Sequence, residues 1–141
     1  AYFYYSTNGP SWNRYNFMSI NNNVCRWNVG NGEYADGVHC NWDGMIVEIE
    51  FNDDDSFRGS IIPRELGLLT KLTRLQSVDT ALIGRIPTEV GLLTKLTGID
   101  LSSNELTGRI PSEIGLLTQL ASMWLSRNSL TGRIPSEVGR L

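Results

Sequence analysis

The sequence predicts an α/β solenoid: a right-handed superhelix with a parallel β-sheet on its concave face and short 3-10 or helical turns on its convex side. Three observations carry this prediction. Glycine recurs every 24 residues, at Gly67, Gly91, Gly115 and Gly139. Apolar residues two positions apart, such as Ile99 and Leu101, are typical of a short strand with one buried side. A fixed period of roughly 20 to 29 residues with regular leucines indicates stacked coils, none of which buries its apolar edge alone.

The predicted strand is followed by a turn that carries asparagine in the two clearest copies, at Asn104 and Asn128. A side-chain amide there can bond backbone groups of adjoining coils that would otherwise stay buried and unpaired. We therefore expect these two residues to form a structural asparagine ladder. Copy two has Ser77 and Thr80 where leucine and asparagine are expected, and looser stacking follows because threonine supplies only part of that bonding.

The second half of each repeat reads Gly-x-Ile-Pro. Glycine suits a tight bend, and a proline can begin a short helical turn, where its missing N–H costs little. We expect such turns at Pro87, Pro111 and Pro135. Copy one is the most irregular, because extra residues interrupt it near Asp53 and again near Ile61.

Composition narrows the possible functions. The chain has 141 residues and a net charge of −3, which fits one domain and disfavours nucleic acid as a partner. No apolar run approaches the roughly 18 residues of a membrane span, so we expect membrane attachment only through segments outside this sequence. Cys25 and Cys40, without other metal-ligand residues clustered nearby, favour one disulfide over a metal site. That disulfide predicts an oxidising compartment.

The pattern LxxLxLxxNxLtGxIPxxIGxL resembles the plant-type leucine-rich repeat, and residues 45–141 carry about four copies, the last incomplete. Residues 1–44 resemble the N-terminal cap of this family, since "CRW" and "GVHC" match its paired-cysteine motif. The resemblance implies a disulfide-bonded cap, a second short strand in each LtGxIP portion, and further repeats after Leu141. Similar repeats occur in receptor-like kinase ectodomains, secreted inhibitors of wall-degrading enzymes and algal proteins.

The sequence offers little support for catalysis or for the binding of a cofactor or metal ion. His39 is the only histidine, and no nucleophile signature surrounds any serine, so we interpret it as a surface residue of the cap. No phosphate-binding glycine motif is present, and we predict no cofactor. The run Asp53, Asp54, Asp55 could hold Ca²⁺, but it lacks the remaining ligands of a calcium loop, and we predict a solvated acidic turn instead. We expect no enzymatic activity.

Two polar columns could also serve a function. Arg85, Arg109 and Arg133 repeat in step with glutamates four residues later, which favours a charged solubility stripe over a groove for polyanions. Threonines recur at Thr70, Thr94 and Thr118, as in some repeat proteins that bind ice, but the sequence keeps no broad threonine array.

The solvent side of the predicted sheet is the best candidate for a binding surface, because its residues change from copy to copy while core positions do not. We predict partner contacts at Glu50, Arg74, Gln76, Asp100, Trp124 and Arg127. An exposed Trp or Arg is typical of binding hot spots. The hypothesis is a non-catalytic, extracellular or otherwise extracytoplasmic module that binds a protein, peptide or glycan. The alternative is a structural or assembly subunit of a permanent complex or extracellular matrix.

Overall fold

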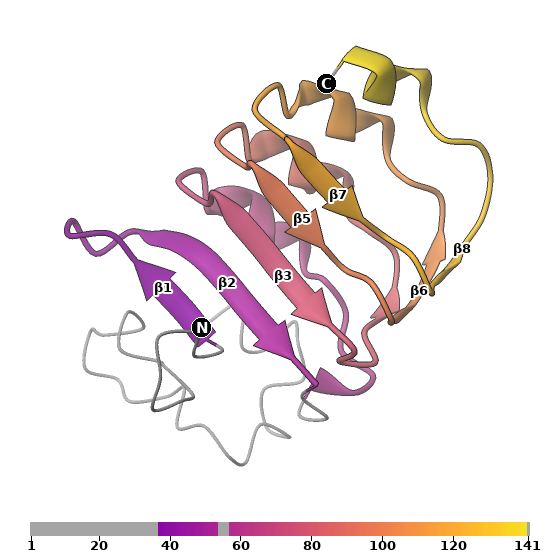
Figure 1. The fold of residues 1–141 in the computed structure, drawn as a ribbon, viewed down its shortest axis with the longest axis horizontal. Helices are drawn as coiled ribbons and strands as arrows, with labels where there is room; N and C mark the ends of the chain where they lie inside the picture. The colour runs from indigo at the N-terminus through magenta and orange to yellow at the C-terminus, as the bar shows by residue number, and fades with distance from the viewer. Residues whose placement is uncertain (1–36, 54–56, 141) are drawn as a thin grey trace.

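The computed structural model describes residues 37–53 and 57–140, and these form stacked coils. Each coil contributes one strand to a main sheet: β2 (Ile46–Asn52), β3 (Arg74–Val78), β5 (Gly98–Asp100) and β7 (Ser122–Trp124). These strands pair in parallel, in the order of the sequence (Figure 1). The predicted solenoid is therefore confirmed.

The register stacks equivalent residues of successive repeats. Leu75 pairs with Ile49 on one side and Ile99 on the other, and Ile99 pairs with Met123. Their side chains point into the coil, as the alternation in the sequence predicts. The core is one continuous apolar column, and its most completely buried members include Leu66, Leu72, Leu93, Leu96, Leu106 and Leu117.

One strand of the main sheet runs against the others. β1 (Gly37–Cys40) lies inside the predicted cap and pairs antiparallel with β2, so that His39 lies opposite Glu48. The strands of the repeats, from β2 onward, are parallel as predicted, and the antiparallel strand belongs to the predicted cap. A hairpin allows this arrangement, because a short turn at Asn41–Gly44 joins β1 to β2. Asn41 holds the turn: its Oδ1 accepts from the backbone N–H groups of Asp43 and Met45, and its carbonyl oxygen accepts from that of Gly44.

A second, smaller sheet runs along another side of the coils, as the family resemblance implied. It contains β4 (Ile83–Gly84), β6 (Glu105–Gly108) and β8 (Ser129–Leu130), paired in parallel. Gly108 closes this segment with a φ of 77°, a left-handed conformation that glycine adopts without strain. The predicted bend before Ile-Pro is therefore present.

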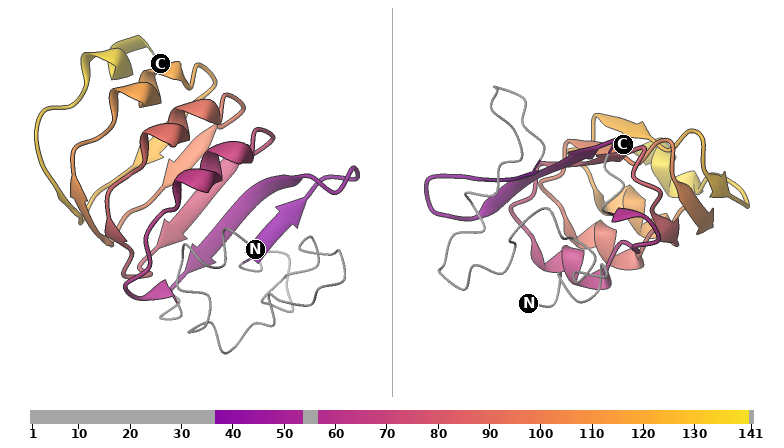
Figure 2. Two further views of the ribbon diagram at one scale, coloured as in Figure 1. Left: turned by 180° about the vertical axis from the view of Figure 1, so that it is seen from behind. Right: turned by 90° about the horizontal axis from the view of Figure 1, so that it is seen from below.

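Each coil returns to the main sheet through a 3-10 turn, on the side away from the sheet face (Figure 2). These turns are η4 (Arg64–Leu68), η5 (Thr88–Leu92), η6 (Ser112–Leu116) and η7 (Ser136–Arg140). The predicted prolines stand just before them: Pro87 is the N-cap of η5, and its carbonyl accepts a hydrogen bond from Val90. Within the described residues, no helix is both long and apolar enough to cross a membrane.

Successive 3-10 turns pack so closely that the repeated glycine becomes a packing requirement. A Cβ added to Gly91 would lie 2.7 Å from the main-chain oxygen of Glu113 in the next coil. Gly139 occupies the same position in the last described coil, where an added Cβ meets nothing within 4 Å. The period-24 glycine therefore reflects contact between coils.

Copy two has two small polar residues, Ser77 and Thr80, where copies three and four have leucine and asparagine. Ser77 and Thr80 are buried and hydrogen-bonded to each other at 2.8 Å. Ser77 lies in register with Phe51 and replaces the leucine found at Leu101. An apolar cavity of about 40 Å³ lies beside it, lined by residues of the first two coils and by Leu101.

Candidate interaction surface on the main sheet

The solvent side of the main sheet carries two rows of side chains across the coils. In one row Glu50, Gln76, Asp100 and Trp124 are successive register partners. In the other row Glu48, Arg74, Gly98 and Ser122 are successive partners. Five of the six predicted contact residues, all except Arg127, therefore lie on one face within neighbouring strands.

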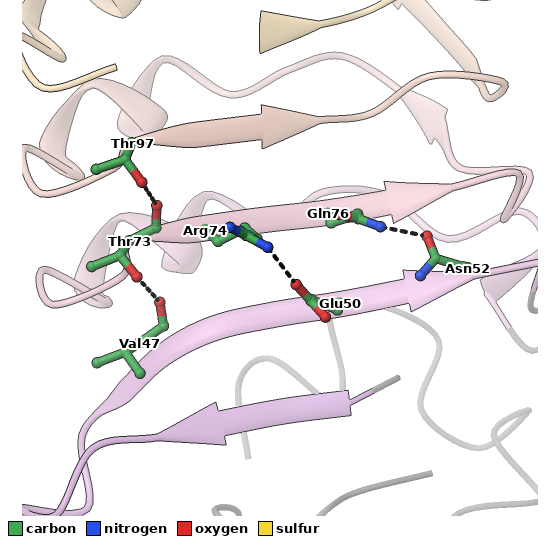
Figure 3. Close-up of polar contacts among 7 residues, drawn as sticks. All are labelled: Val47, Glu50, Asn52, Thr73, Arg74, Gln76 and Thr97. Carbon is green, nitrogen blue, oxygen red and sulfur yellow. Dashed lines mark hydrogen bonds and ion pairs between the residues drawn. The ribbon is translucent and has the colours of Figure 1, made fainter. Parts of the chain in front are cut away.

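Four side-chain contacts join neighbouring coils at the β2 and β3 end of this face (Figure 3). Arg74 Nη1 lies 3.4 Å from Glu50 Oε1, and Gln76 Nε2 donates to Asn52 Oδ1 at 2.9 Å. Thr73 Oγ1 donates to the carbonyl oxygen of Val47, and Thr97 repeats this bond to Thr73. The positive charge of Arg74 is thus already paired before any partner binds.

Next to these contacts the sheet face is hollowed over β3, β5 and β7. The groove has a volume of about 450 Å³, and its lining includes Arg74, Gln76, Gly98, Asp100, Ser122 and Trp124. Its depth follows from the small residues at Gly98, Ala121 and Ser122, which leave room between the longer side chains. Glu50 does not line the groove; it acts there by holding Arg74.

Asp100 and Trp124 form the other end of the groove. Asp100 Oδ1 accepts hydrogen bonds from Ser102, at 3.0 Å from the backbone N–H and 2.6 Å from the hydroxyl. Oδ2 of Asp100 has no partner among the residues that the structure describes. Trp124 remains 55% exposed although it belongs to a strand. This end of the groove thus offers a carboxylate oxygen and an open indole.

Arg127 lies outside this groove. It follows β7 in a left-handed conformation, with φ 54°, and Asp79 and Ser103 adopt the same conformation at the equivalent positions. The backbone turns there away from the strand, so the side chain at this position no longer follows the strand's alternation. This left-handed column could not be predicted from the sequence, because none of its residues is glycine.

The two predicted ladder asparagines lie behind the face, at the turn after the strand. Asn104 Oδ1 accepts from the backbone N–H groups of Thr80 and Leu82 in the preceding coil. Its Nδ2 donates to carbonyl oxygens of Ser77 and Leu101. Asn128 repeats this arrangement one coil further along, with Leu106 and Leu101 among its partners. Each amide therefore ties two coils together and holds the end of the strand.

The remaining candidates do not assemble into a second site. His39 is half-buried in β1, and Asp54 and Asp55 lie outside the described residues. Among the residues described, no group of three or more His, Cys, Asp or Glu side chains could hold a metal ion. Cys40 ends β1 and is not a free thiol, whereas Cys25 lies outside the described part, so their pairing stays a prediction.

The two charged columns do not pair with each other. Within the described parts of the chain, the ion pairs given by side-chain distances join Arg74 to Glu50 and Arg64 to Glu65. The column glutamates accept hydrogen bonds from the hydroxyl groups that precede them, as Glu89 does from Thr88. Arg85 instead extends across Gly108 of the next coil, where an added Cβ would lie 3.0 Å from its Cδ.

A column of exposed leucines escaped the sequence analysis. Leu68, Leu92 and Leu116 end successive 3-10 turns with exposed side chains, while the leucine that directly follows each of them is buried or half-buried. Their strict 24-residue spacing was the available signal. Exposed Thr70, Thr94 and Thr118 follow them two residues later.

The fold and its open sheet face define a repeat protein of the solenoid class. The family model described as Leucine Rich Repeat matches residues 95–117 and 119–141. The ectodomain of the Arabidopsis receptor kinase HAESA, solved in complex with an IDA peptide hormone, is 41% identical with a TM-score of 0.53, over 55% of this chain and 13% of that one. The chain therefore contains leucine-rich repeats, and its solenoid fold is that of the plant leucine-rich repeat ectodomains it matches.

Two further solved structures extend this comparison. PEPR1, in a structure with AtPEP1, matches with a TM-score of 0.66 and 28% identity over 73% of this chain. A plant ice-binding protein matches with a TM-score of 0.63 and 27% identity over 98% of this chain. The chain spans only 14% of the PEPR1 chain and 49% of the ice-binding protein. No curated protein matches the sequence.

Proposed function

We propose that the chain is a non-catalytic, extracellular recognition module, and that the groove over β3, β5 and β7 binds an extended segment of a peptide or protein. The observation that carries the proposal is the groove itself: about 450 Å³, open on the sheet face, with a 55% exposed indole at one end. An exposed aromatic side chain that packs against a partner contributes apolar area at a small cost in conformational entropy.

Three further features support a peptide as the partner. The groove crosses several strands, so an extended chain lying along it meets side chains from successive coils. The coils are held in register by backbone pairing and by Asn104, so the surface is formed before binding and little ordering is needed. The matched structures of HAESA and PEPR1 are, by their descriptions, complexes with a peptide hormone and with AtPEP1.

The test is selection of binders from a displayed library of random dodecapeptides, with the chain immobilised as bait. We expect peptides that bind the wild type and are lost on the double variant Trp124→Ala, Arg74→Ala. The matched control is Trp42→Ala, Arg109→Ala, because Trp42 is 94% exposed at the β1–β2 turn and Arg109 is exposed away from the groove. Unchanged thermal unfolding must be verified for both variants.

Either of two results contradicts the proposal. Peptides that bind both double variants equally well would place recognition away from the groove. A failure to select any peptide, from a library that yields binders for another immobilised protein, would favour the alternative of a structural subunit. Such a subunit should remain in a complex of fixed stoichiometry during purification from its source.

Ice is a second candidate ligand, favoured by the match over 98% of the chain to a plant ice-binding protein. The surface concerned is the convex column of exposed Thr70, Thr94 and Thr118 beside exposed Leu92 and Leu116. Stacked coils repeat these hydroxyl and methyl groups at about the strand spacing of ~4.8 Å. Slower ice recrystallisation in the presence of the chain, abolished by Thr94→Lys and retained in Trp124→Ala, is the expected result if ice is bound there.

A further inference from the structure

The polar groups of the groove differ in whether they are already satisfied. Arg74 is paired with Glu50 at 3.4 Å, and the amide nitrogen of Gln76 is bonded to Asn52. Asp100 is different, because both of its hydrogen bonds use Oδ1 and both come from Ser102. Arg74 lies on the adjacent strand but forms no ion pair with Asp100 within 4.0 Å. The groove therefore contains one carboxylate whose charge is not neutralised by a neighbouring cation.

Trp124 lies directly beside that carboxylate. The two residues are register partners on β5 and β7, so their side chains emerge from the same face on adjacent strands. Residues directly paired in a sheet place their Cβ atoms about 5 Å apart. The indole is half-exposed to the groove, and Ser122 and Gly98 leave an open space next to both side chains.

A carboxylate next to an aromatic face favours a cationic ligand. The carboxylate attracts a positive charge, and the negative face of an indole attracts the same charge within about 6 Å of the ring centre. A guanidinium group fits both partners, because it is planar, stacks on aromatic rings and donates to carboxylate oxygens. The strand-face charges agree: Glu48, Glu50 and Asp100 outnumber the single cation Arg74.

We infer that the Asp100–Trp124 end of the groove is a subsite for a cationic side chain of the bound peptide, with arginine preferred to lysine. This inference rests on the proposed function and specifies the chemistry of the partner. Oδ2 of Asp100 accepts a hydrogen bond from the guanidinium, and the ring of Trp124 stacks on it.

The experiment uses the peptides selected from the random dodecapeptide library. Arginine should be enriched at one position, and replacement of that arginine by citrulline, its neutral isostere, should weaken binding to the wild type at least about fivefold. Replacement by lysine should weaken it less. The affinity for the arginine peptide should also fall as salt is raised from 0.05 to 0.5 M, because part of the pair is solvent-exposed, with a Debye length of about 8–10 Å near physiological salt.

Asp100→Asn tests the contribution of the negative charge of Asp100. Asparagine retains an Oδ1 acceptor for the two bonds from Ser102, so the turn is preserved while the charge is removed. On this variant the arginine and citrulline forms should bind equally. Trp124→Leu should reduce the difference between them by about half. Asp43→Asn and Trp42→Leu, at an exposed neighbouring Asp and Trp on the β1–β2 turn, should leave the difference unchanged.

The outcomes separate this inference from the proposed function. Selected peptides that depend on Trp124 and Arg74 but tolerate citrulline would overturn the cationic subsite and leave peptide recognition in place. An arginine preference that persists in full on Asp100→Asn would place the cation elsewhere and overturn the inference as well. If no selected peptide depends on the groove, both proposals fail.

Discussion

A single methyl group added at the repeated glycine should have opposite effects in two coils. Gly91 and Gly139 occupy the same position of the repeat, and neither has a φ in the left-handed region. An alanine Cβ at Gly91 would lie 2.7 Å from both the Cβ and the main-chain oxygen of Glu113. At Gly139 it would meet nothing within 4 Å. Gly91→Ala and Gly139→Ala therefore test close packing between coils with one substitution.

The expected magnitudes follow from two opposing effects. Where the backbone conformation is compatible, Gly→Ala stabilises a protein by about 0.4–1 kcal/mol, because the unfolded chain loses freedom. Overpacking a filled site costs about 1–3 kcal/mol, and rotation of a side chain cannot relieve a contact with a main-chain oxygen. We expect Gly139→Ala to be neutral or slightly stabilising and Gly91→Ala to be destabilising by about 1–3 kcal/mol.

Urea unfolding followed by circular dichroism measures both variants. The midpoint should fall for Gly91→Ala at an unchanged slope, and should not fall for Gly139→Ala. A changed slope would instead mean that the coils no longer unfold together, which is a known behaviour of repeat proteins. If Gly91→Ala unfolds within about 0.5 kcal/mol of Gly139→Ala, the repeated glycine is not required by the contact with the next coil.

The same unfolding assay checks three other predictions. Asn104→Ala removes the described side-chain partner of three buried backbone groups (Thr80 N–H, Leu82 N–H and the Ser77 carbonyl) and should cost at least about 3 kcal/mol, at ~1 kcal/mol each. Asn128→Ala should cost about 1 kcal/mol, since its partners are only partly buried; equal losses would refute the argument. Ser77→Leu should stabilise the folded chain by about 1 kcal/mol, because three added carbons at ~0.8 kcal/mol each outweigh one lost hydrogen bond. A lower urea midpoint would mean that the cavity cannot accept these carbons. Ser103 has a φ of 57°, so Ser103→Val should cost more than about 1 kcal/mol, whereas Ser103→Gly should stay within about 0.5 kcal/mol of wild type. Equal stabilities of the two variants would mean that this φ is not maintained in solution.

The repeat pattern by itself determined the parts of the fold that depend on local geometry and on periodicity. A two-residue alternation places Ile99 and Leu101 inside, a glycine such as Gly108 permits the bend, and a proline such as Pro87 precedes the 3-10 turn. The amide of Asn104 was also assigned correctly to bonding between coils. These assignments succeed because every coil repeats the same local requirements.

The composition of the groove was decided only by the tertiary structure. Which side chains pair across coils depends on register, so the sequence could not show that Glu50 neutralises Arg74 while Asp100 keeps a free carboxylate oxygen. The left-handed turn at Arg127 carries that residue away from the groove, although it lies only three positions after Trp124. The first result depends on how one coil lies against the next, over a distance along the chain that no local pattern encodes. The second depends on a left-handed backbone conformation at a residue other than glycine, which the residue type does not signal.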